Sequence, residues 1–211
     1  MKTALIFDLD NTIYPVNAIA GNLFAELFAL LDRHAEIINK DHTDIVARIK
    51  EEMTRRPFQY IVDKYGLKTE IREQMEETLR NMTYDLPMQP FEDYHSLKKI
   101  QLDRYLVTTG YPKLQYSKIR QLGIVRDFRE IYIVDPDKSR QTKKDVFASI
   151  MGKYEYSPEQ LLVIGDDPES EIKAALELGI DTFLFDPGNR YEDASTTHRS
   201  PTLKDVLNIL N

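Results

Sequence analysis

Residues 3–14 read TALIFDLDNTIY, a short apolar run that ends in two carboxylates. Residues 4–7 are continuously apolar, which is typical of a strand buried on both faces of a parallel sheet. Asp8 and Asp10 are two residues apart, so on an extended chain both side chains point the same way from the carboxyl end of that strand. Ligands bind at that end of open α/β sheets, and a divalent cation would compensate two close carboxylates. Alone, the pattern fits equally well a strand exit that carries two solvated acids.

The rest of the chain predicts helices first and then strands and helices in alternation. After Pro15, apolar residues recur at helical spacing, and no strand pattern appears before Leu86. Four further apolar runs predict strands at 105–110, 130–134, 161–165 and 182–185, and helical patterns cover 22–31, 44–53, 57–65, 70–82, 90–97, 114–122, 142–151 and 169–178. We expect a surface loop over 186–202 and then a last helix. This alternation predicts an α/β fold with a doubly wound parallel sheet.

The long helical stretch between the first two strands predicts an insertion over the end of the first strand. We therefore expect a core formed by residues 1–15 and 88–211, and a helical cap formed by residues 16–87. Closing such a cap would exclude water from a site at the strand ends and would select the substrate.

Composition limits the possible partners. The 211 residues hold 28 Lys and Arg against 35 Asp and Glu, which gives a net charge of −7 and no basic stretch. Bulk electrostatics thus argues against a nucleic acid polymer, whereas a small phosphorylated compound stays compatible because a metal and one or two lysines can reverse the local charge. No stretch resembles a signal peptide or a membrane span, so we expect a cytoplasmic protein without a membrane partner. The sequence leaves monomer and homodimer open.

Polar groups follow two further predicted strands. Thr108 and Thr109 offer hydroxyl donors, and Gly110 would let backbone N–H groups approach an anion, although a plain strand exit would look the same. Gly165 is followed by acids at Asp166, Asp167 and Glu171, which could equally be the favoured acids of a helix N-terminus. That alternative does not explain why the first strand also ends in two carboxylates.

Lysines open the helix predicted at 142–151, where a cation is unfavourable for the helix dipole and a functional role is therefore plausible. Lys143 and Lys144 both lie at this helix start and Lys138 lies upstream, although a solvated pair of lysines would look the same.

Together, these four segments resemble the haloacid dehalogenase (HAD) superfamily, in which phosphatases dominate. The match comprises FDLDNT at 7–12, LVT at 106–108, Lys143, and GD at 165–166 with Glu171, and it covers nearly the whole chain. Lys143 matches the family's lysine best because Val146 and Phe147 fall where the family's helix turns inward, with Lys144 and Lys138 as alternatives. The resemblance implies a Rossmann-like core with an inserted helical cap. The cap also looks similar to the pyrimidine 5'-nucleotidase and phosphoglycolate phosphatase-like branch, through YIVDKYGL at 60–67. A nucleoside 5'-monophosphate is thus one expected substrate, with phosphoglycolate and sugar phosphates left open.

The resemblance implies a Mg²⁺-dependent phosphomonoester hydrolase that forms an aspartyl-phosphate. Its catalytic residues would be Asp8 as nucleophile, Asp10 as general acid and base, and Thr108 and Lys143 as partners of the phosphoryl oxygens. The substrate would also contact Asn11, Thr109 and Gly110, and the metal ligands would come from Asp8, Asp10, Asp166, Asp167 and Glu171, the last two through water. Asp10 favours phosphorus chemistry, since the dehalogenases of this superfamily lack that carboxyl.

Two other functions are compatible with parts of this pattern. A signalling receiver domain also uses an aspartyl-phosphate, but it carries the acceptor after a middle strand and has no large helical insertion. A catalytically inactive HAD-fold binding or regulatory protein is the remaining alternative, and turnover would separate it from an enzyme.

Overall fold

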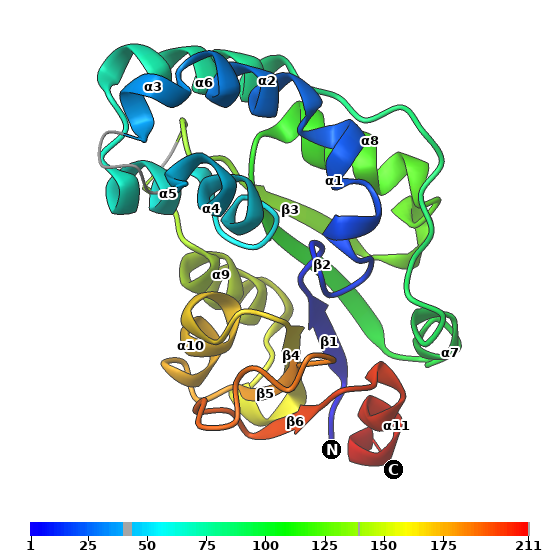
Figure 1. Cartoon of the computed structure of the whole chain (residues 1–211). Coiled ribbons are helices and arrows are strands. Elements are labelled where there is room, and N and C mark those ends of the chain that lie inside the picture. Colours follow the sequence, from blue (N-terminus) through cyan, green and yellow to red (C-terminus); the bar gives the residue numbers. More distant parts are fainter. Residues whose placement is uncertain (40–43, 139, 211) are drawn as a thin grey trace.

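The protein contains a single parallel sheet, whose strands lie in the order β3-β2-β1-β4-β5-β6 (Figure 1). The computed structural model describes residues 1–39, 44–138 and 140–210. The strands are β1 (Ala4–Phe7), β2 (Asp103–Thr109), β3 (Glu130–Val134), β4 (Leu161–Gly165), β5 (Asp181–Phe185) and β6 (His198–Ser200). β1 is central and pairs with β2 and β4, so that Phe7 lies beside Leu106 and Ile164. The carboxyl ends of these three strands therefore meet, and the predicted doubly wound parallel fold is confirmed.

Helices connect the strands from β1 to β5 and cover both faces of the sheet. They are α1 (Ala20–Leu23), α2 (Ala25–Arg33), α3 (Ala35–Ile38), α4 (Ile45–Glu52), α5 (Phe58–Tyr65), α6 (Thr69–Asn81), α7 (Tyr94–Leu97), α8 (Pro112–Gln121), α9 (Lys143–Tyr154), α10 (Lys173–Leu176) and α11 (Val206–Leu210). Figure 1 shows α2 to α6 standing above the sheet, on the side toward which β1 points. Helices α2 to α6 thus lie over the strand ends that carry the polar residues, whereas α7 lies at the other end of the sheet, near α11.

The sheet separates two apolar cores, as expected for strands buried on both faces. Leu5 and Phe7 belong to the core shared with the helices that follow β1, whereas Ala4 and Ile6 belong to the core under α9. The alternation follows the two-residue period of a strand. All of β1 and β4 is buried, which explains why their sequences are continuously apolar.

Three local predictions differ from the structure. Residues 186–202 are not all loop, because His198–Ser200 forms β6 beside β5. Its three residues are too short and too polar to give a period-2 signal. The helix expected over 22–31 is interrupted at Phe24, and the helix expected from 169 begins as a π-helical turn over Pro168–Ile172. Such turns are rare and often occur at functional sites.

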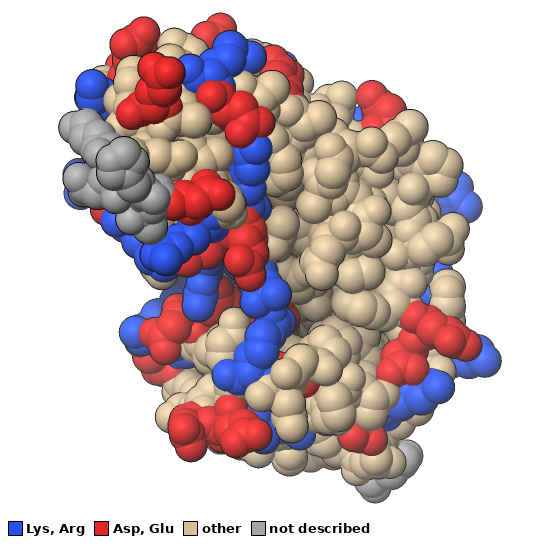
Figure 2. Space-filling model, viewed as in Figure 1, with Lys and Arg blue, Asp and Glu red and all other residues tan. Residues whose placement is uncertain are grey.

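The surface carries mixed charge. On the face shown in Figure 2, basic and acidic side chains are interspersed along the side of α4, α5 and α10, while the side near α1 and α8 carries few charges. Within the described ranges, no helix is both long and apolar enough to cross a membrane.

Candidate active site

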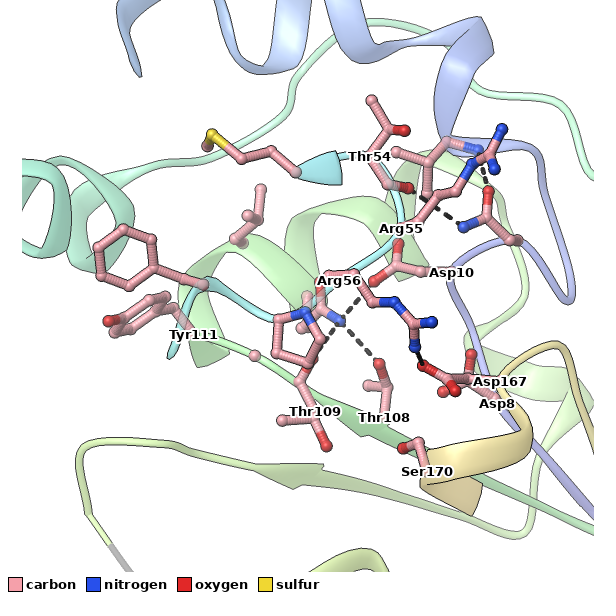
Figure 3. A pocket seen from close by; sticks show the side chains of 18 of the residues that line it. Asp8, Asp10, Thr54, Arg55, Arg56, Thr108, Thr109, Tyr111, Asp167 and Ser170 are labelled. Atoms are coloured by element: carbon pink, nitrogen blue, oxygen red, sulfur yellow. Dashed lines mark hydrogen bonds and ion pairs between the residues drawn. The ribbon is translucent and has the colours of Figure 1, made fainter. Parts of the chain in front are cut away.

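The polar strand ends line one pocket of about 180 Å³ between the sheet and the helices above it (Figure 3). Asp8 directly follows β1, Thr108 lies near the end of β2, and Asp166 follows β4. All residues proposed for the site from the sequence line this pocket: Asp8, Asp10, Asn11, Thr108, Thr109, Gly110, Lys143, Asp166, Asp167 and Glu171. The topology therefore brings together residues that are up to about 160 positions apart in the sequence.

Lys143 is the lysine that reaches the site. Thr142 caps α9 and forms a reciprocal capping box with Asp145, which fixes Lys143 as the first helical residue. The Lys143 side chain is 8% exposed, and its Nζ donates to Asp8 Oδ1 at 2.6 Å and to Glu171 Oε2 at 2.8 Å.

The two alternative lysines point elsewhere. Lys144 pairs with Glu177 on the surface, and Lys138, whose side chain is 81% exposed, lies 3.7 Å from Asp135. The structure therefore selects Lys143 by position among the three lysines.

Three carboxylates meet around Lys143. One oxygen from each of Asp8, Asp166 and Glu171 lies within 4.8 Å of the others. Burial raises the pKa of Asp8 to about 7, with Lys143 opposing and Glu171 adding to this effect. Burial, together with the charges of Glu171 and Asp8, raises the pKa of Asp166 well above its usual range. For Glu171, burial also raises the pKa, but Lys143 outweighs it and the net pKa is lowered.

This group of carboxylates fits a divalent cation. Three carboxylates share one ammonium in a buried place, so Asp8 and Asp166 keep their protons to a higher pH unless another cation compensates them. Oxygen donors are the ligands that Mg²⁺ prefers, and a bound cation would offset the burial and the repulsion that raise the pKa values of Asp8 and Asp166.

Glu171 reaches the group because Gly165 leaves room for it. The π-helical turn folds Glu171 back over the end of β4, and the Asp167 backbone N–H donates to Glu171 Oε1 at 2.8 Å. A Cβ atom on Gly165 would lie 2.1 Å from that oxygen. No side chain larger than hydrogen is therefore compatible with this position of Glu171.

Asp10 faces α8 rather than the three-carboxylate group. Lys118 Nζ donates to both of its oxygens, at 2.7 and 3.0 Å, Gln115 Nε2 donates to Oδ2 at 3.0 Å, and the Tyr14 hydroxyl donates to Oδ1. Burial raises the pKa of Asp10, but Lys118, Gln115 and Tyr14 outweigh it and lower the net pKa. Asp10 is thus held as a carboxylate next to the pocket.

Gln115 and Lys118 are site residues that the sequence interpretation missed. Both lie on the buried face of α8, beside Leu114 and Ile119. The sequence could have revealed them, because both are polar residues at positions where the helical period predicts apolar ones. Gln115 Nε2 also donates to Thr108 Oγ1 at 2.7 Å and to the Thr109 carbonyl at 3.2 Å.

The segment between α4 and α5 closes the other side of the pocket (Figure 3). Asn11, which has a positive φ of 56°, donates from Nδ2 to the Thr54 carbonyl at 3.2 Å. Arg56 Nη1 donates to Asp167 Oδ2 at 2.9 Å. Asp167 is therefore engaged by Arg56, and the sequence interpretation did not identify this arginine.

Comparisons with known proteins agree with this geometry. The sequence profile of the haloacid dehalogenase-like hydrolases matches residues 2–179. The HAD-hydrolase YfnB of Bacillus subtilis is 24% identical over 98% of this chain and 94% of its own. The crystal structure of YfnB bound to magnesium superimposes with a TM-score of 0.67 at 22% identity, covering 100% of this chain and 99% of that one.

Two other relatives carry the names of phosphate-releasing enzymes. The pyrimidine 5'-nucleotidase PynA of Streptococcus pneumoniae is 28% identical over 55% of this chain and 50% of its own. The glyceraldehyde 3-phosphate phosphatase of Methanopyrus kandleri is 23% identical over 92% of this chain and 87% of its own.

Proposed function

Because the chain belongs to the haloacid dehalogenase-like hydrolases, we propose that it is a Mg²⁺-dependent phosphatase that hydrolyses a small phosphomonoester through an aspartyl-phosphate on Asp8. The observation that carries this proposal is the buried contact of Asp8 with Lys143 inside a group of three carboxylates. A nucleophilic carboxylate, a cation for the phosphoryl oxygens and a metal-binding oxygen set then share one pocket.

In the first step, an oxygen of Asp8 attacks phosphorus and the bond from phosphorus to the alcohol oxygen breaks. Asp10, once protonated, gives its proton to that oxygen as the alcohol leaves. Lys143 and the Thr108 hydroxyl donate to the phosphoryl oxygens, where charge is spread in the transition state.

In the second step, Asp10 takes a proton from water, and the water oxygen attacks the phosphorus of the aspartyl-phosphate. Inorganic phosphate leaves and Asp8 is regenerated. Asp8 and Asp166, with the main-chain carbonyl of Asp10, would hold Mg²⁺, which when bound would neutralise the charge of the phosphate dianion. Glu171, expected from the sequence to act through water, has an oxygen within 4.8 Å of those of Asp8 and Asp166 and would join them. Asp167 would act through water.

The Asp10 carboxylate favours chemistry at phosphorus over displacement at carbon. Lys118, Gln115 and Tyr14 hold this carboxylate at the pocket, where an acid and base is needed for an alcohol leaving group. A displacement of halide from carbon has no use for such a group.

For the substrate, we propose a nucleoside 5'-monophosphate as the class to test first. Away from Asp8, the pocket is walled by apolar and aromatic side chains such as Phe24, Phe58 and Tyr111, with the amide of Gln59 among them. Aromatic rings stack well with a base, and an amide offers both a donor and an acceptor to its edge. The resemblance to PynA supports the same class. Residues 16–87 would form the cap that closes over it, while residues 1–15 and 88–211 would form the core.

The test is a phosphate-release screen with Mg²⁺ over nucleoside monophosphates, sugar phosphates, glyceraldehyde 3-phosphate and phosphoglycolate, with Asp8→Asn run beside the wild type. We expect release that depends on Mg²⁺, is lost in EDTA and falls by at least about 10³-fold in Asp8→Asn. Preference for one compound names the substrate class. Equal release by wild type and Asp8→Asn with every compound would exclude the phosphatase and leave a non-catalytic binding protein.

A further inference from the structure

Two buried polar side chains of α8 contact the proposed acid and base. Gln115 is 1% exposed and Lys118 is 4% exposed. A buried ammonium is costly unless it is paired, and an apolar side chain would fill the same place on this helix face. Packing therefore does not explain Lys118, whose Nζ contacts both oxygens of Asp10.

We propose that Gln115 and Lys118 are positioning residues that hold the Asp10 carboxylate and the Thr108 hydroxyl in one arrangement for phosphoryl transfer. This inference rests on the proposed phosphatase function. It assigns to α8 the positioning of Asp10 and Thr108, whose side chains lie outside the group of three carboxylates.

Gln115 links the Thr108 hydroxyl and the Asp10 carboxylate through one amide nitrogen. Nε2 lies 2.7 Å from Thr108 Oγ1 and 3.0 Å from Asp10 Oδ2. Because Thr108 Oγ1 accepts this bond, its own hydrogen stays available to donate into the pocket, where a phosphoryl oxygen would lie. Gly110 gives the Gln115 side chain room, since a Cβ there would lie 3.1 Å from it, a tight contact.

Lys118 holds Asp10 without blocking it. A carboxylate has about four lone-pair sites, and contacts from Lys118 to both oxygens, from Gln115 and from Tyr14 occupy them. Asp10 must release a donor to carry a proton to or from the substrate. Because Lys118 contacts both oxygens, it keeps its hold on one oxygen while the other turns to the leaving group.

The test compares Lys118→Met with Lys113→Met. Lys113 lies on the same helix but is exposed and contacts Asn81 at 3.1 Å. For each variant, kcat/KM is measured with the best alkyl phosphomonoester and with p-nitrophenyl phosphate, whose leaving group departs as a stable anion without a proton.

For Lys118→Met we expect kcat/KM to fall about 100-fold with the alkyl ester but less than about fivefold with p-nitrophenyl phosphate, because only the alkyl ester needs the proton of Asp10. The loss should appear in kcat, while KM changes less than about threefold. Lys113→Met should match the wild type. Equal losses with both substrates, or no loss with either, would overturn the role of Lys118.

A double-mutant cycle with Asp10→Asn shows whether Lys118 acts through Asp10. Asp10→Asn and Asp10→Asn/Lys118→Met should have the same kcat/KM, since the group that Lys118 holds is already removed. The double variant loses both charges of the pair, so it serves even if Lys118→Met alone does not fold. A further large loss in the double variant would contradict the inference.

The role of Gln115 is tested by product inhibition. Gln115→Leu should raise the inhibition constant of inorganic phosphate about tenfold, because the Thr108 hydroxyl is no longer oriented, whereas Lys118→Met should leave it unchanged. An unchanged constant in Gln115→Leu would overturn its link to Thr108. If the wild type itself released no more phosphate than Asp8→Asn, the proposed function would fail, and this result is distinct from each of the others.

Discussion

At the scale of single residues, the site is governed by how burial and charge are divided between two aspartates. Asp8 is buried among carboxylates and one lysine, which raises its pKa to about 7. Asp10 is equally close to the pocket, but Lys118 and its neighbours lower its pKa. Two residues of the same type, two positions apart, therefore have opposite electrostatic surroundings. In the proposed mechanism both pKa shifts must reverse when metal and substrate bind, because the nucleophile acts as a carboxylate and the acid must carry a proton.

The raised pKa of Asp8 predicts a specific pH dependence of stability. An unfolded Asp8 releases its proton near pH 3.8, but the folded protein keeps it until about pH 7. Between these values the folded state binds more protons, so raising the pH favours unfolding. In EDTA, Asp8→Asn should gain stability relative to the wild type from pH 4 to 7, by up to about 1.4 kcal/mol per pH unit.

Urea unfolding of both proteins at each pH measures this difference. Saturating Mg²⁺ should remove most of the trend in the wild type, because the cation takes the place of the proton. A stability difference that stays constant from pH 4 to 7 in EDTA would show that Asp8 does not titrate in this range.

Gly165 gives a second prediction at this scale. Gly165→Ala should displace Glu171, because the new Cβ would lie 2.1 Å from Oε1. We expect the Mg²⁺ concentration for half-maximal activity to rise about tenfold or more. Gly152→Ala, in the exposed last turns of α9 with open space around it, is the control, and should keep the Mg²⁺ requirement and gain about 0.5–1 kcal/mol of stability. An unchanged Mg²⁺ requirement in Gly165→Ala would show that Glu171 does not take part in metal binding.

At the scale of elements, three short structures set the site. The capped start of α9 delivers Lys143, the π-helical turn after β4 delivers Glu171, and α8 delivers Gln115 and Lys118. The capping box of α9 can be found in the sequence as Thr142 and Asp145, and it would have favoured Lys143 over Lys144 and Lys138. The contacts of Gln115 and Lys118 could not be found in this way, because they depend on how α8 packs against the loop after β1.

The segment between α4 and α5 gives the prediction that belongs to elements. Arg56 joins it to Asp167 across the pocket, with side chains that are 28% and 16% exposed. Arg56→Ala should weaken this attachment by about 0.5–1 kcal/mol and increase amide hydrogen exchange over residues 54–58 by roughly three- to fivefold.

The control is Arg72→Ala, whose partner Glu76 lies on the same helix and which should leave exchange over residues 54–58 unchanged. Exchange in this segment that is equal in Arg56→Ala and the wild type would show that Asn11 and packing alone hold it.

At the scale of the whole molecule, the parallel fold was predictable because its buried strands are continuous apolar runs, and the prediction is confirmed together with the family resemblance. The ten residues proposed for the site line one pocket, since the carboxyl ends of neighbouring strands must meet. β6 was missed because its pairing partner, not its own sequence, makes it a strand. The roles of the site residues and the boundaries at 15/16 and 87/88 stay predictions.

The central position of β1 also has a consequence for biosynthesis. β1 precedes the other strands of the sheet in the sequence, and its two neighbours begin only at Asp103 and Leu161. At about 5–20 residues per second, the second neighbour follows on the order of ten seconds or more later. Both edges of this apolar strand are open to aggregation until β2 is made, and one edge stays open until β4 follows. Lys2, Asp8 and Asp10 flank this strand, and such flanking charges act as gatekeepers against aggregation. We therefore expect Asp8 and Asp10 to limit aggregation of the nascent chain before the pocket that they line has formed.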